Sequence, residues 1–469
     1  MDASRLKVAT LAIIPFCMAA AIWWTHPHIA YDTDSPRYLI GSAMRTATYP
    51  LFLRAIDSRA WLPIQLLLFA AALSWAAVYS SRVVSWIVAG AMMLAMAANP
   101  YVWQLQGTVM SESLTTPLLT LTVGCILGFA VTSRSWTVIA AALFCGIATT
   151  ARPSLLPLIV APLCAVWLAP GLSRRVRLSA IILIVWAAPV AAERLYSRAV
   201  HGSELTSPMG RQLFMKAAVI DAPPTLPTSN DPLDRTLAQE LNSGFAPVRQ
   251  LIDRTQDRDV RWILLTNYEG CAGWGCFTNA WSSFHVPEAE LHRHLFSIGL
   301  ARLKSNPLGY LKLTATEYPR MWLLHQRKLP TIAPKYNALL AREGSIPFEA
   351  ELGEEGQPTP AAQQKSILRV NRVVFAAIGL LAGLMTIGFA FWNRQPLARA
   401  ALSLLVGSQA VLVLSAFLGS GLVRYAMGMW PTIIAAELLG MLALLALLKP
   451  QLANRQLTHG LQPMHTQQV

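Results

Sequence analysis

Charged residues are scarce in this chain, and acidic ones most of all. Asp, Glu, Lys and Arg make up 13% of the 469 residues, only 24 of which are Asp or Glu, whereas 54% are hydrophobic and the mean hydropathy is +0.43. An average soluble domain is far more polar than this. The composition therefore excludes an ordinary soluble protein and predicts an all-α polytopic membrane protein.

Acids are so few that the formal net charge reaches +14, yet the sequence forms no single basic face. The arginines fall in small clusters between apolar segments, as the positive-inside rule requires of cytoplasmic loops. A nucleic-acid-binding surface needs its cations gathered on one face. We therefore expect no nucleic-acid partner. The sequence also shows no repeat at a solenoid period.

Cysteine is rare as well, with six in the chain. Four of them lie within apolar segments, where a thiol behaves as a small hydrophobe and carries no information on redox state. The other two, Cys271 and Cys276, flank glycines in "EGCAGWGCF". In an oxidising compartment this spacing favours a local disulfide. A metal site there would need further ligands that the neighbouring sequence does not offer.

Apolar segments dominate what is present, and about ten of them are long enough to cross a bilayer if short or tilted spans are allowed. Their approximate ranges are 7–24, 62–80, 83–98, 111–131, 136–150, 154–169, 178–192, 369–392, 398–418 and 430–448. Arg5 and Lys7 before the first segment also resemble the start of a signal peptide. The run continues to Trp23 and Trp24, which favours an uncleaved helix that ends in an interfacial belt.

The charges of the connecting loops predict the topology. If the N-terminus is cytoplasmic, every loop on that side carries Lys or Arg, and both termini are cytoplasmic. The acids and prolines concentrate in a long segment on the outer side, which we expect to be a mainly helical soluble insert. The predicted organisation is an N-terminal membrane module at 1–192, the insert at 193–366, C-terminal membrane helices at 367–450 and a tail at 451–469.

Two acids stand beside the first predicted span, in the stretch "YDTDSPRYL". Turn and helix-cap chemistry is one explanation for Asp32 and Asp34. Catalysis is the other, because a carboxylate tuned by a neighbouring charge can act as a general base or hold a metal. Residues two apart in an extended loop point to opposite sides, so both acids reach one substrate only if the loop bends.

Three further segments place charge at the same predicted membrane face. Glu112 in "MSESL" opens an apolar segment, where it either complements the helix dipole, with Ser111 as cap, or joins a site. Arg152 in "TTARPS" and Arg424 with Tyr425 in "GLVRYAMGMWP" stand at the outer edges of other segments. An arginine there either anchors to lipid headgroups or binds a phosphate. Their convergence on one face favours a site.

The first outer loop is itself basic, which runs against the positive-inside rule. Its stretch "TATYPLFLRAIDSRAW" has the pattern of an amphipathic helix lying in the membrane interface. An anionic lipid phosphate would account for cations on this side. The arginines of the loop are Arg37, Arg45, Arg54 and Arg59.

Two other groups have competing explanations. His285, Glu288 and His292 could share a helix face and hold zinc, but we favour an ordinary surface helix. Glu437 lies well inside the last predicted span, where an acid is either functional or neutral and hydrogen-bonded to another helix. The sequence leaves the role of Glu437 open.

Taken in order, these motifs resemble the GT-C superfamily of integral membrane glycosyltransferases, in particular the bacterial branch of protein mannosyltransferases and the lipid A aminoarabinose transferase. The matching stretches are "YDTDSPRYL", "TYPLFL", "MSESL", "ARPSLLPL", "NPLGYLKL" and "RYAMGMWP". The resemblance implies a GT-C-like bundle in the bacterial inner membrane, a periplasmic active site and a polyprenyl-phosphate-linked sugar, such as an undecaprenyl one, as donor.

The resemblance also implies roles for single residues. Asp34 is the first choice for the base that activates the acceptor and Asp32 the second, while Glu112 matches the acid of the later motif. The expected donor-phosphate ligands are Arg152, Arg424, Tyr425, Arg37 and Arg54. The related enzymes carry adjacent Asp and Glu, whereas Thr33 separates the two acids here, so their substrates cannot be carried over. Mg²⁺ or Mn²⁺ at the two aspartates is compatible with oxygen ligands but not required.

The sequence thus predicts an inverting transferase acting on an envelope glycan, lipid or protein. One alternative is a lipid or solute transporter, in which the same charges would line a path. Another is an O-antigen polymerase or ligase, which would rest its chemistry on an Arg or His of the long loop. Sugar, acceptor and oligomeric state are not readable from one sequence.

Overall fold

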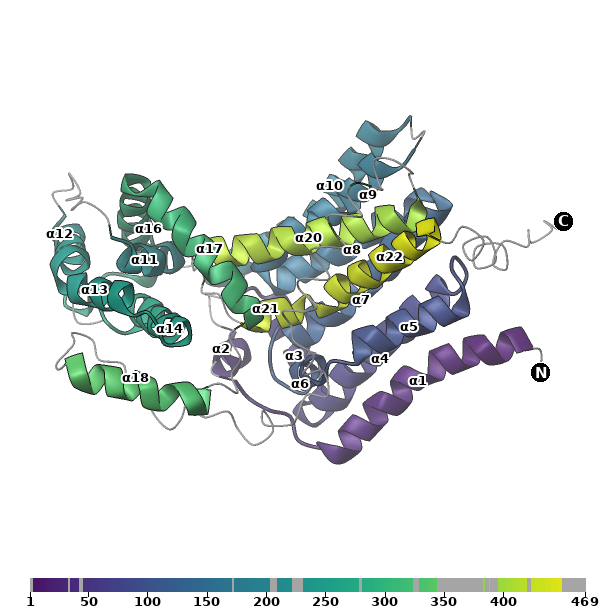
Figure 1. Cartoon of the computed structure of the whole chain (residues 1–469), viewed down its shortest axis with the longest axis horizontal. Coiled ribbons are helices and arrows are strands. Elements are labelled where there is room, and N and C mark those ends of the chain that lie inside the picture. The colour runs from purple at the N-terminus through teal and green to yellow at the C-terminus, as the bar shows by residue number, and fades with distance from the viewer. Residues whose placement is uncertain are drawn as a thin grey trace. The chain divides into compact units, whose positions relative to one another are not determined.

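The computed structural model describes residues 3–32, 34–41, 45–170, 173–202, 209–221, 231–277, 281–323, 329–343, 383, 388, 395–419 and 423–448 of the chain (Figure 1). Throughout these residues the regular structure is helical, and no strand is formed. Extended backbone pairs at an isolated parallel bridge between Ala30 and Thr108. The described residues are therefore those of an all-α protein, as the composition predicted.

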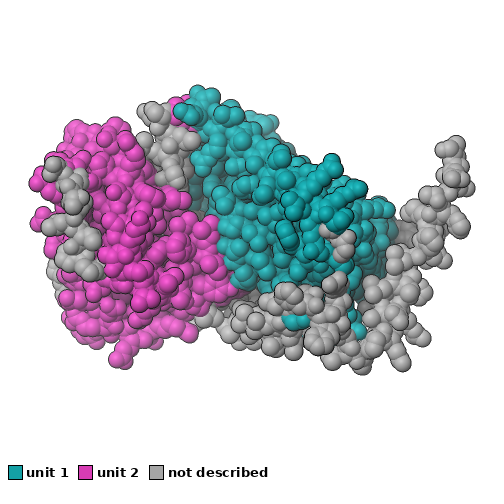
Figure 2. Space-filling model, turned by 90° about the horizontal axis from the view of Figure 1, so that it is seen from above, with its two compact units in different colours: residues 1–199, 366–411, 427–469 teal, residues 200–365, 412–426 magenta. Residues whose placement is uncertain are grey.

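The chain divides into two compact units, coloured separately in Figure 2. The first unit comprises residues 1–199, 366–411 and 427–469, and the second comprises 200–365 and 412–426. The insert predicted at 193–366 corresponds closely to the longer part of the second unit. That unit also takes in residues 412–426, which we had assigned to the C-terminal membrane helices.

The first unit holds the helices of the N-terminal half and the last helix. Their bounds are α1 Ala3–Thr25, α2 Ser35–Ile40, α3 Thr48–Arg54, η1 Ser58–Ala60, α4 Trp61–Ser80, α5 Trp86–Ala97, α6 Pro100–Gln106, α7 Glu112–Thr132, α8 Ser135–Ala151, η2 Pro153–Ile159, α9 Val160–Leu168, α10 Arg175–His201 and α22 Trp430–Leu448. Helix α20, Pro396–Leu418, lies in this unit up to residue 411.

The second unit is built from shorter amphipathic helices. Their bounds are α11 Met209–Val219, α12 Pro232–Gln239, η4 Glu240–Gly244, α13 Ala246–Arg254, α14 Arg258–Trp274, α16 Glu288–Ser305, α17 Pro307–Leu323 and α18 Leu329–Glu343. The end of α20 and most of α21, Val423–Gly428, also belong to it.

Within the described residues, five helices are long and apolar enough to cross a membrane, or six if the bent pair α5 and α6 counts as one span. Three further apolar stretches, at 135–151, 153–168 and 430–446, are shorter. The span predicted at 369–392 falls almost wholly outside the described residues. The chain is that of a membrane protein, while the figure of ten spans stays a prediction.

Helix α7 lies at the centre of the first unit, and α10 lies at its edge. In their most apolar windows, 78% of α7 is buried by other residues but only 11% of α10. An apolar helix left uncovered by protein is stable only in lipid. Helix α7 packs closely on α4 because Gly124 and Gly128, four residues apart, leave room for Trp75 and Tyr79. Membrane helices commonly use such small residues where their backbones approach.

A separate hydrophobic core holds the second unit together, with Phe214, Phe245 and Leu264 fully buried. The carbonyl groups that end α11 are satisfied by two buried arginines. Arg302 Nε donates to the Ala217 carbonyl at 2.9 Å and Arg249 Nη1 to the Ala218 carbonyl at 3.1 Å. Cations are favourable at a helix C-terminus, so both arginines stabilise the end of α11.

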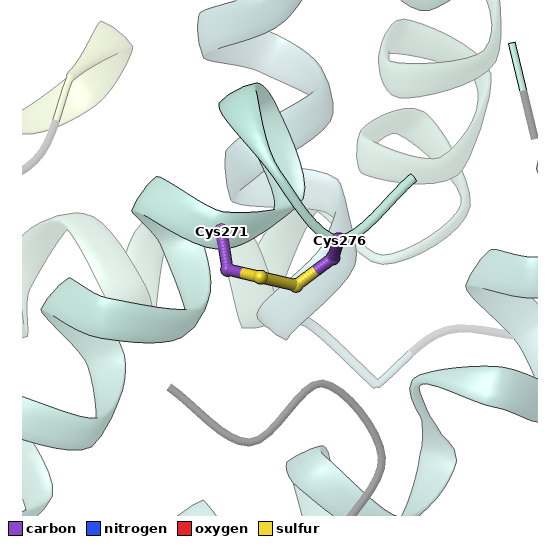
Figure 3. Close-up of a disulfide and its surroundings, with 2 residues drawn as sticks. All are labelled: Cys271 and Cys276. Atoms are coloured by element: carbon purple, nitrogen blue, oxygen red, sulfur yellow. A yellow bond between two sulfur atoms is a disulfide. The ribbon is translucent and has the colours of Figure 1, made fainter. Parts of the chain in front are cut away.

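Cys271 and Cys276 form a disulfide at the end of α14, with their Cα atoms 4.9 Å apart (Figure 3). The bridge closes a short loop that contains Gly275, whose amide donates to the Cys271 carbonyl. The chain therefore leaves α14 at a fixed point.

A network of four buried charges joins three helices of the second unit. Lys216 Nζ lies 3.0 Å from Glu269 Oε1 and 3.9 Å from Glu317 Oε2, and Arg320 Nη1 lies 2.6 Å from Glu317 Oε1. All four side chains are at most 1% exposed. Burial, with the neighbouring Glu317 charge, raises the pKa of Glu269 to about 7. The network links α11, α14 and α17 through charge as well as apolar contact.

Candidate functional site

The loop after α1 is tied to the segment that enters α7. The Ala30 amide donates to the Gly107 carbonyl at 2.8 Å, and the Val109 amide donates to the Ala30 carbonyl at 2.9 Å. Ser35 Oγ also donates to the Val109 carbonyl, at 2.8 Å. The end of α1 and the start of α7 therefore lie at one end of the first unit, and the two acid motifs meet there.

Asp34 stands just before α2, at the N-cap position, but its carboxylate does not cap the helix. Instead, Oδ1 accepts a hydrogen bond from Arg45 Nη2 at 2.5 Å. The Arg45 guanidinium also lies over the Tyr38 ring, 5.0 Å from its centroid. The Asp34 and Arg45 side chains are 15% and 25% exposed, so solvent reaches this ion pair. The cap explanation of Asp34 is not what the geometry shows.

Glu112 begins α7, where an acid complements the positive end of the helix dipole. Its Oε1 lies 2.6 Å from Arg152 Nη1, and Arg152 Nε donates to Ser154 Oγ at 3.2 Å. The Glu112 side chain is only 2% exposed and that of Arg152 12%. This second ion pair is therefore nearly sealed from solvent, and it joins the start of α7 to the end of α8.

Tyr38 and Ser111 connect the two ion pairs. The Tyr38 hydroxyl donates to Ser111 Oγ at 3.2 Å, and the Ser111 hydroxyl donates to Glu112 Oε2 at 3.2 Å. Ser111 thus binds the glutamate side chain and makes no side-chain cap to α7, so the structure does not show the capping role that was one of the two alternatives. Burial raises the pKa of the Tyr38 phenol, an effect that the Arg45 charge opposes. We therefore expect Tyr38 to stay protonated as a donor.

The two residues that follow Arg45 are held from two other helices. Thr46 Oγ1 donates to the Ala151 carbonyl of α8 at 3.3 Å, and the Ala47 amide donates to Glu193 Oε1 of α10 at 3.1 Å. Sequence reasoning did not select Arg45 or Glu193 as site residues. The excess positive charge of the first outer loop was the available signal for Arg45. No local signal distinguished Glu193.

A buried tyrosine supports the floor of the site. The Tyr49 ring meets the Tyr38 ring edge to face, with centroids 5.1 Å apart. The Tyr49 hydroxyl accepts hydrogen bonds from Gln65 Nε2 at 3.0 Å and from Ser113 Oγ at 3.2 Å. Tyr49 is fully buried, and burial raises the pKa of its phenol. This packing fixes α3 against α4 and α7, and so fixes the Tyr38 ring.

The remaining predicted phosphate ligands have different surroundings. Arg54 Nη2 donates to the Ile40 carbonyl at 3.2 Å and lies against Gly41, whose φ of 66° ends α2. Arg37 is half-buried on α2, and its amide donates to the Asp34 carbonyl at 3.2 Å. Asp32 is exposed, and its amide donates to Ser35 Oγ at 2.7 Å. Arg37 and Asp32 therefore remain close to Asp34 in the chain.

The "RYAMGMWP" motif reaches the site through a glycine that we had not selected. A Cβ at Gly428 would lie 3.4 Å from Arg152 Nη1 and 3.8 Å from Glu112 Cγ. The Arg424 side chain lies outside the described residues, and Tyr425 is half-buried in the second unit. Their predicted phosphate contacts stay predictions.

No group of three or more His, Cys, Asp or Glu side chains is placed as metal ligands among the residues that the structure describes. The Asp34 carboxylate has Arg45 as a partner there, and a cation is a poor neighbour for a divalent ion. Mg²⁺ or Mn²⁺ at Asp32 and Asp34 stays a prediction, and the chemistry proposed below uses no metal.

The three histidines differ in exposure. His292, on the buried side of α16, is 5% exposed, with its Nε2 3.3 Å from Arg211 Nε. His294 Nδ1 lies 2.7 Å from Asp234 Oδ1. His285 is exposed, with Nδ1 2.8 Å from the Ser282 carbonyl. Glu437 is buried on α22, at 4% exposure.

No protein-family model, curated protein or solved structure matches this chain. The resemblance to the GT-C superfamily therefore stays a prediction from the motifs.

Proposed function

We propose that this membrane protein is an inverting glycosyltransferase that uses a polyprenyl-phosphate-linked sugar at the periplasmic face of the bacterial inner membrane. The observation that carries the proposal is the solvent-reached Asp34–Arg45 ion pair, linked by Tyr38 and Ser111 to the buried Glu112–Arg152 pair. An accessible carboxylate with cations around it, at the ends of apolar helices, suits a lipid-bound anionic donor and a hydroxyl acceptor.

Asp34 is the base in this scheme. Its carboxylate takes the proton of an acceptor hydroxyl, and the acceptor oxygen attacks the anomeric carbon of the donor sugar from the face opposite the phosphate. The bond between that carbon and the phosphate oxygen breaks, and the electron pair leaves with the polyprenyl phosphate. The new glycosidic bond has the opposite anomeric configuration.

Arg45 has two roles in turn. In the structure it occupies Oδ1 of Asp34 in an ion pair. A donor phosphate competes for the guanidinium, because arginine binds phosphate in a bidentate manner as well as carboxylate. Donor binding would thus free Asp34 and place a cation where negative charge develops on the leaving group.

The Glu112–Arg152 pair helps to hold Tyr38 and Arg45 in place, because Ser111 links Glu112 to Tyr38. The carboxylate partner of Arg152 is only 2% exposed, unlike that of Arg45, so we assign Arg152 chiefly to holding α7 and α8 together. Arg37 and Arg54 remain candidates for the phosphate, and Arg54 has one donor engaged by the Ile40 carbonyl.

The test is a comparison of envelope glycans and glycolipids by mass spectrometry in a deletion strain. Wild type, Asp34→Asn and Asp57→Asn are restored separately at equal expression. Asp57 is the matched control, because it lies in the same outer loop and caps η1 through the Arg59 amide. We expect one sugar to disappear on deletion and to return with wild type and Asp57→Asn only. Full restoration by Asp34→Asn removes Asp34 from the mechanism.

A transporter is the second candidate, and one observation favours it. Helices α5 and α6 are bent by 66° at Asn99 and Pro100, and broken helices are typical of transport sites. The same break places Gly107 and Val109 against the loop after α1. An enzyme with its site at that loop would need this arrangement as much as a transporter would. Flipping of a fluorescent lipid-linked sugar by the purified protein in vesicles, unaffected by Asp34→Asn, would favour transport.

A further inference from the structure

Helix α17 turns an apolar face outward from the second unit. Leu308 is 78% exposed and Leu311 is 56% exposed, and Ala315 continues the same face one turn later. At 3.6 residues per turn, the exposed positions 307, 308, 311, 312 and 315 occupy one arc of about 140°. The opposite side is buried and includes Tyr310, Leu313, Glu317, Arg320 and Met321.

This face is unusual for a unit with its own core. Burying one leucine stabilises a fold by about 1.5–3 kcal/mol. Two neighbouring leucines that stay in water therefore lose a large part of the free energy that burial would provide. Among the described residues of the unit, Val200 and Val413 are also more than half exposed, but they lie on the apolar helices α10 and α20. The other exposed large hydrophobics, Met209, Phe284 and Phe296, are at most 40% exposed and are not paired on one helix face. Single exposed side chains need no explanation, whereas a contiguous apolar face does.

The charge of α17 indicates what covers the face. Lys312 lies within the exposed arc, and Lys304 is exposed three residues before the helix begins. The only acid of α17, Glu317, is fully buried in the charge network and adds no negative charge to the surface of the helix. Leucines bordered by lysines, without exposed acids, are typical of helices that lie in the interface of an anionic bilayer.

A second observation connects α17 to a candidate membrane span. The last turn of α20 belongs to the same compact unit as α17, and α20 is long and apolar enough to cross a membrane. The Tyr310 ring packs on Phe417 of α20 with centroids 4.5 Å apart, and the Tyr310 hydroxyl donates to the Phe417 carbonyl. The buried side of α17 is therefore fastened to the end of a candidate span, where a bilayer surface begins.

We propose that α17 is an interfacial helix that docks the second unit on anionic lipid. Leu308 and Leu311 enter the boundary between headgroups and acyl chains, while Lys304 and Lys312 contact lipid phosphates. The docking fixes the unit at the membrane surface without any covalent step. It does not depend on the glycosyltransferase proposal, because none of its residues belongs to the site at Asp34.

Spin labels on the full-length protein test the proposal. Leu308→Cys, Leu311→Cys and the control Gln250→Cys are made with Cys17, Cys125, Cys145 and Cys164 replaced by Ala and the native disulfide kept. Gln250 is exposed on α13 of the same unit. Each protein is reconstituted in vesicles of phosphatidylglycerol and phosphatidylethanolamine, and collisions with oxygen and with a water-soluble nickel chelate are compared.

At positions 308 and 311 we expect an oxygen-to-nickel collision ratio several times that at position 250. Equal ratios at all three positions, or shielding of 308 and 311 from both reagents, would overturn the proposal, since the face would then be in water or in protein contact. Adding Lys304→Glu and Lys312→Glu should lower the ratio at 308 in the anionic vesicles. A ratio unchanged by charge reversal would contradict the lipid-phosphate contacts. Far-UV circular dichroism checks that each variant is folded.

Discussion

Two of the sets of acid–base contacts in the molecule differ most clearly in their access to water. Asp34 and Arg45 in the first unit are 15% and 25% exposed, whereas Lys216, Glu269, Glu317 and Arg320 in the second unit are at most 1% exposed. A pair that solvent reaches can exchange partners at low cost, as binding and catalysis require. A sealed network cannot, because each charge relies on the others for its solvation. Solvent exposure therefore distinguishes the candidate site at Asp34 from the structural network at Lys216, whereas the presence of acids and cations does not.

The largest expected effect is on the sealed network. Lys216→Met leaves Glu269 and Glu317 without their shared cation, and breaking a buried pair costs about 3–5 kcal/mol of unfolding free energy. Pulse proteolysis of the full-length protein in increasing urea measures the loss. Arg249→Met is not a suitable control, because it uncovers the end of α11, so Arg254→Met, exposed on α13, serves instead. A loss below that of the control would mean that the network contributes little.

Smaller than this is the loss expected at Tyr49 beneath the site. Tyr49→Phe keeps the ring but removes the acceptor of Gln65 Nε2, and a buried donor without a partner costs about 1–3 kcal/mol. Gln65 Oε1 already lacks a partner among the described residues, so the amide has little chance to compensate. Thermal unfolding in detergent reports the change. Gln65→Leu in the same background should recover part of the loss, because it removes the stranded amide.

The sealed network should also make stability depend on pH. The folded-state pKa of Glu269 is about 7, above its ordinary value of 4.5, so the folded protein binds the extra proton between these values. The contribution of Glu269 to stability is therefore full below about pH 4.5 and falls as pH rises through 7. We expect the thermal midpoint of wild type to drop between pH 5.5 and about 8, and Glu269→Gln to flatten that drop. An unchanged slope in the variant would contradict this assignment.

The smallest effect on stability is expected at the open pair. Arg45→Met should change the unfolding free energy by less than about 1 kcal/mol, because ion pairs reached by solvent contribute little. Sugar transfer in the restored deletion strain should nevertheless fall strongly, since the cation that we assign to the donor phosphate is gone. A large loss of stability with unchanged transfer would reverse the contrast between the two regions.

Part of the site was predictable because its residues lie in short motifs at the ends of apolar segments. Asp34 and Glu112 were selected on their positions beside predicted spans, and the structure brings their motifs together at one end of the first unit. The partner of Asp34 was not predictable from position. Arg45 was one of several arginines in a basic loop, and only the fold shows which of them meets the carboxylate.

Local rules failed where a tertiary partner competed. Ser111 has the right identity and place to cap α7, but the carboxylate of Glu112 and the Tyr38 hydroxyl take its side chain. His292 sits in a polar sequence typical of a surface helix, yet the approach of α11 buries it beside Arg211. Propensity and periodicity describe a chain segment by itself and contain no information on distant segments.

Hydrophobic composition and its period are properties of consecutive residues, so the sequence was enough to predict an all-α membrane protein, while the soluble insert stays a prediction. Packing in three dimensions determines which charges meet, which of them water reaches, and that α17 keeps an apolar face exposed. Those outcomes depend on how helices that are far apart in the chain pack together, because that packing sets which side chains are buried. The partly exposed Asp34–Arg45 pair and the sealed Lys216 network both combine acidic with basic side chains, and packing decides which of them water reaches.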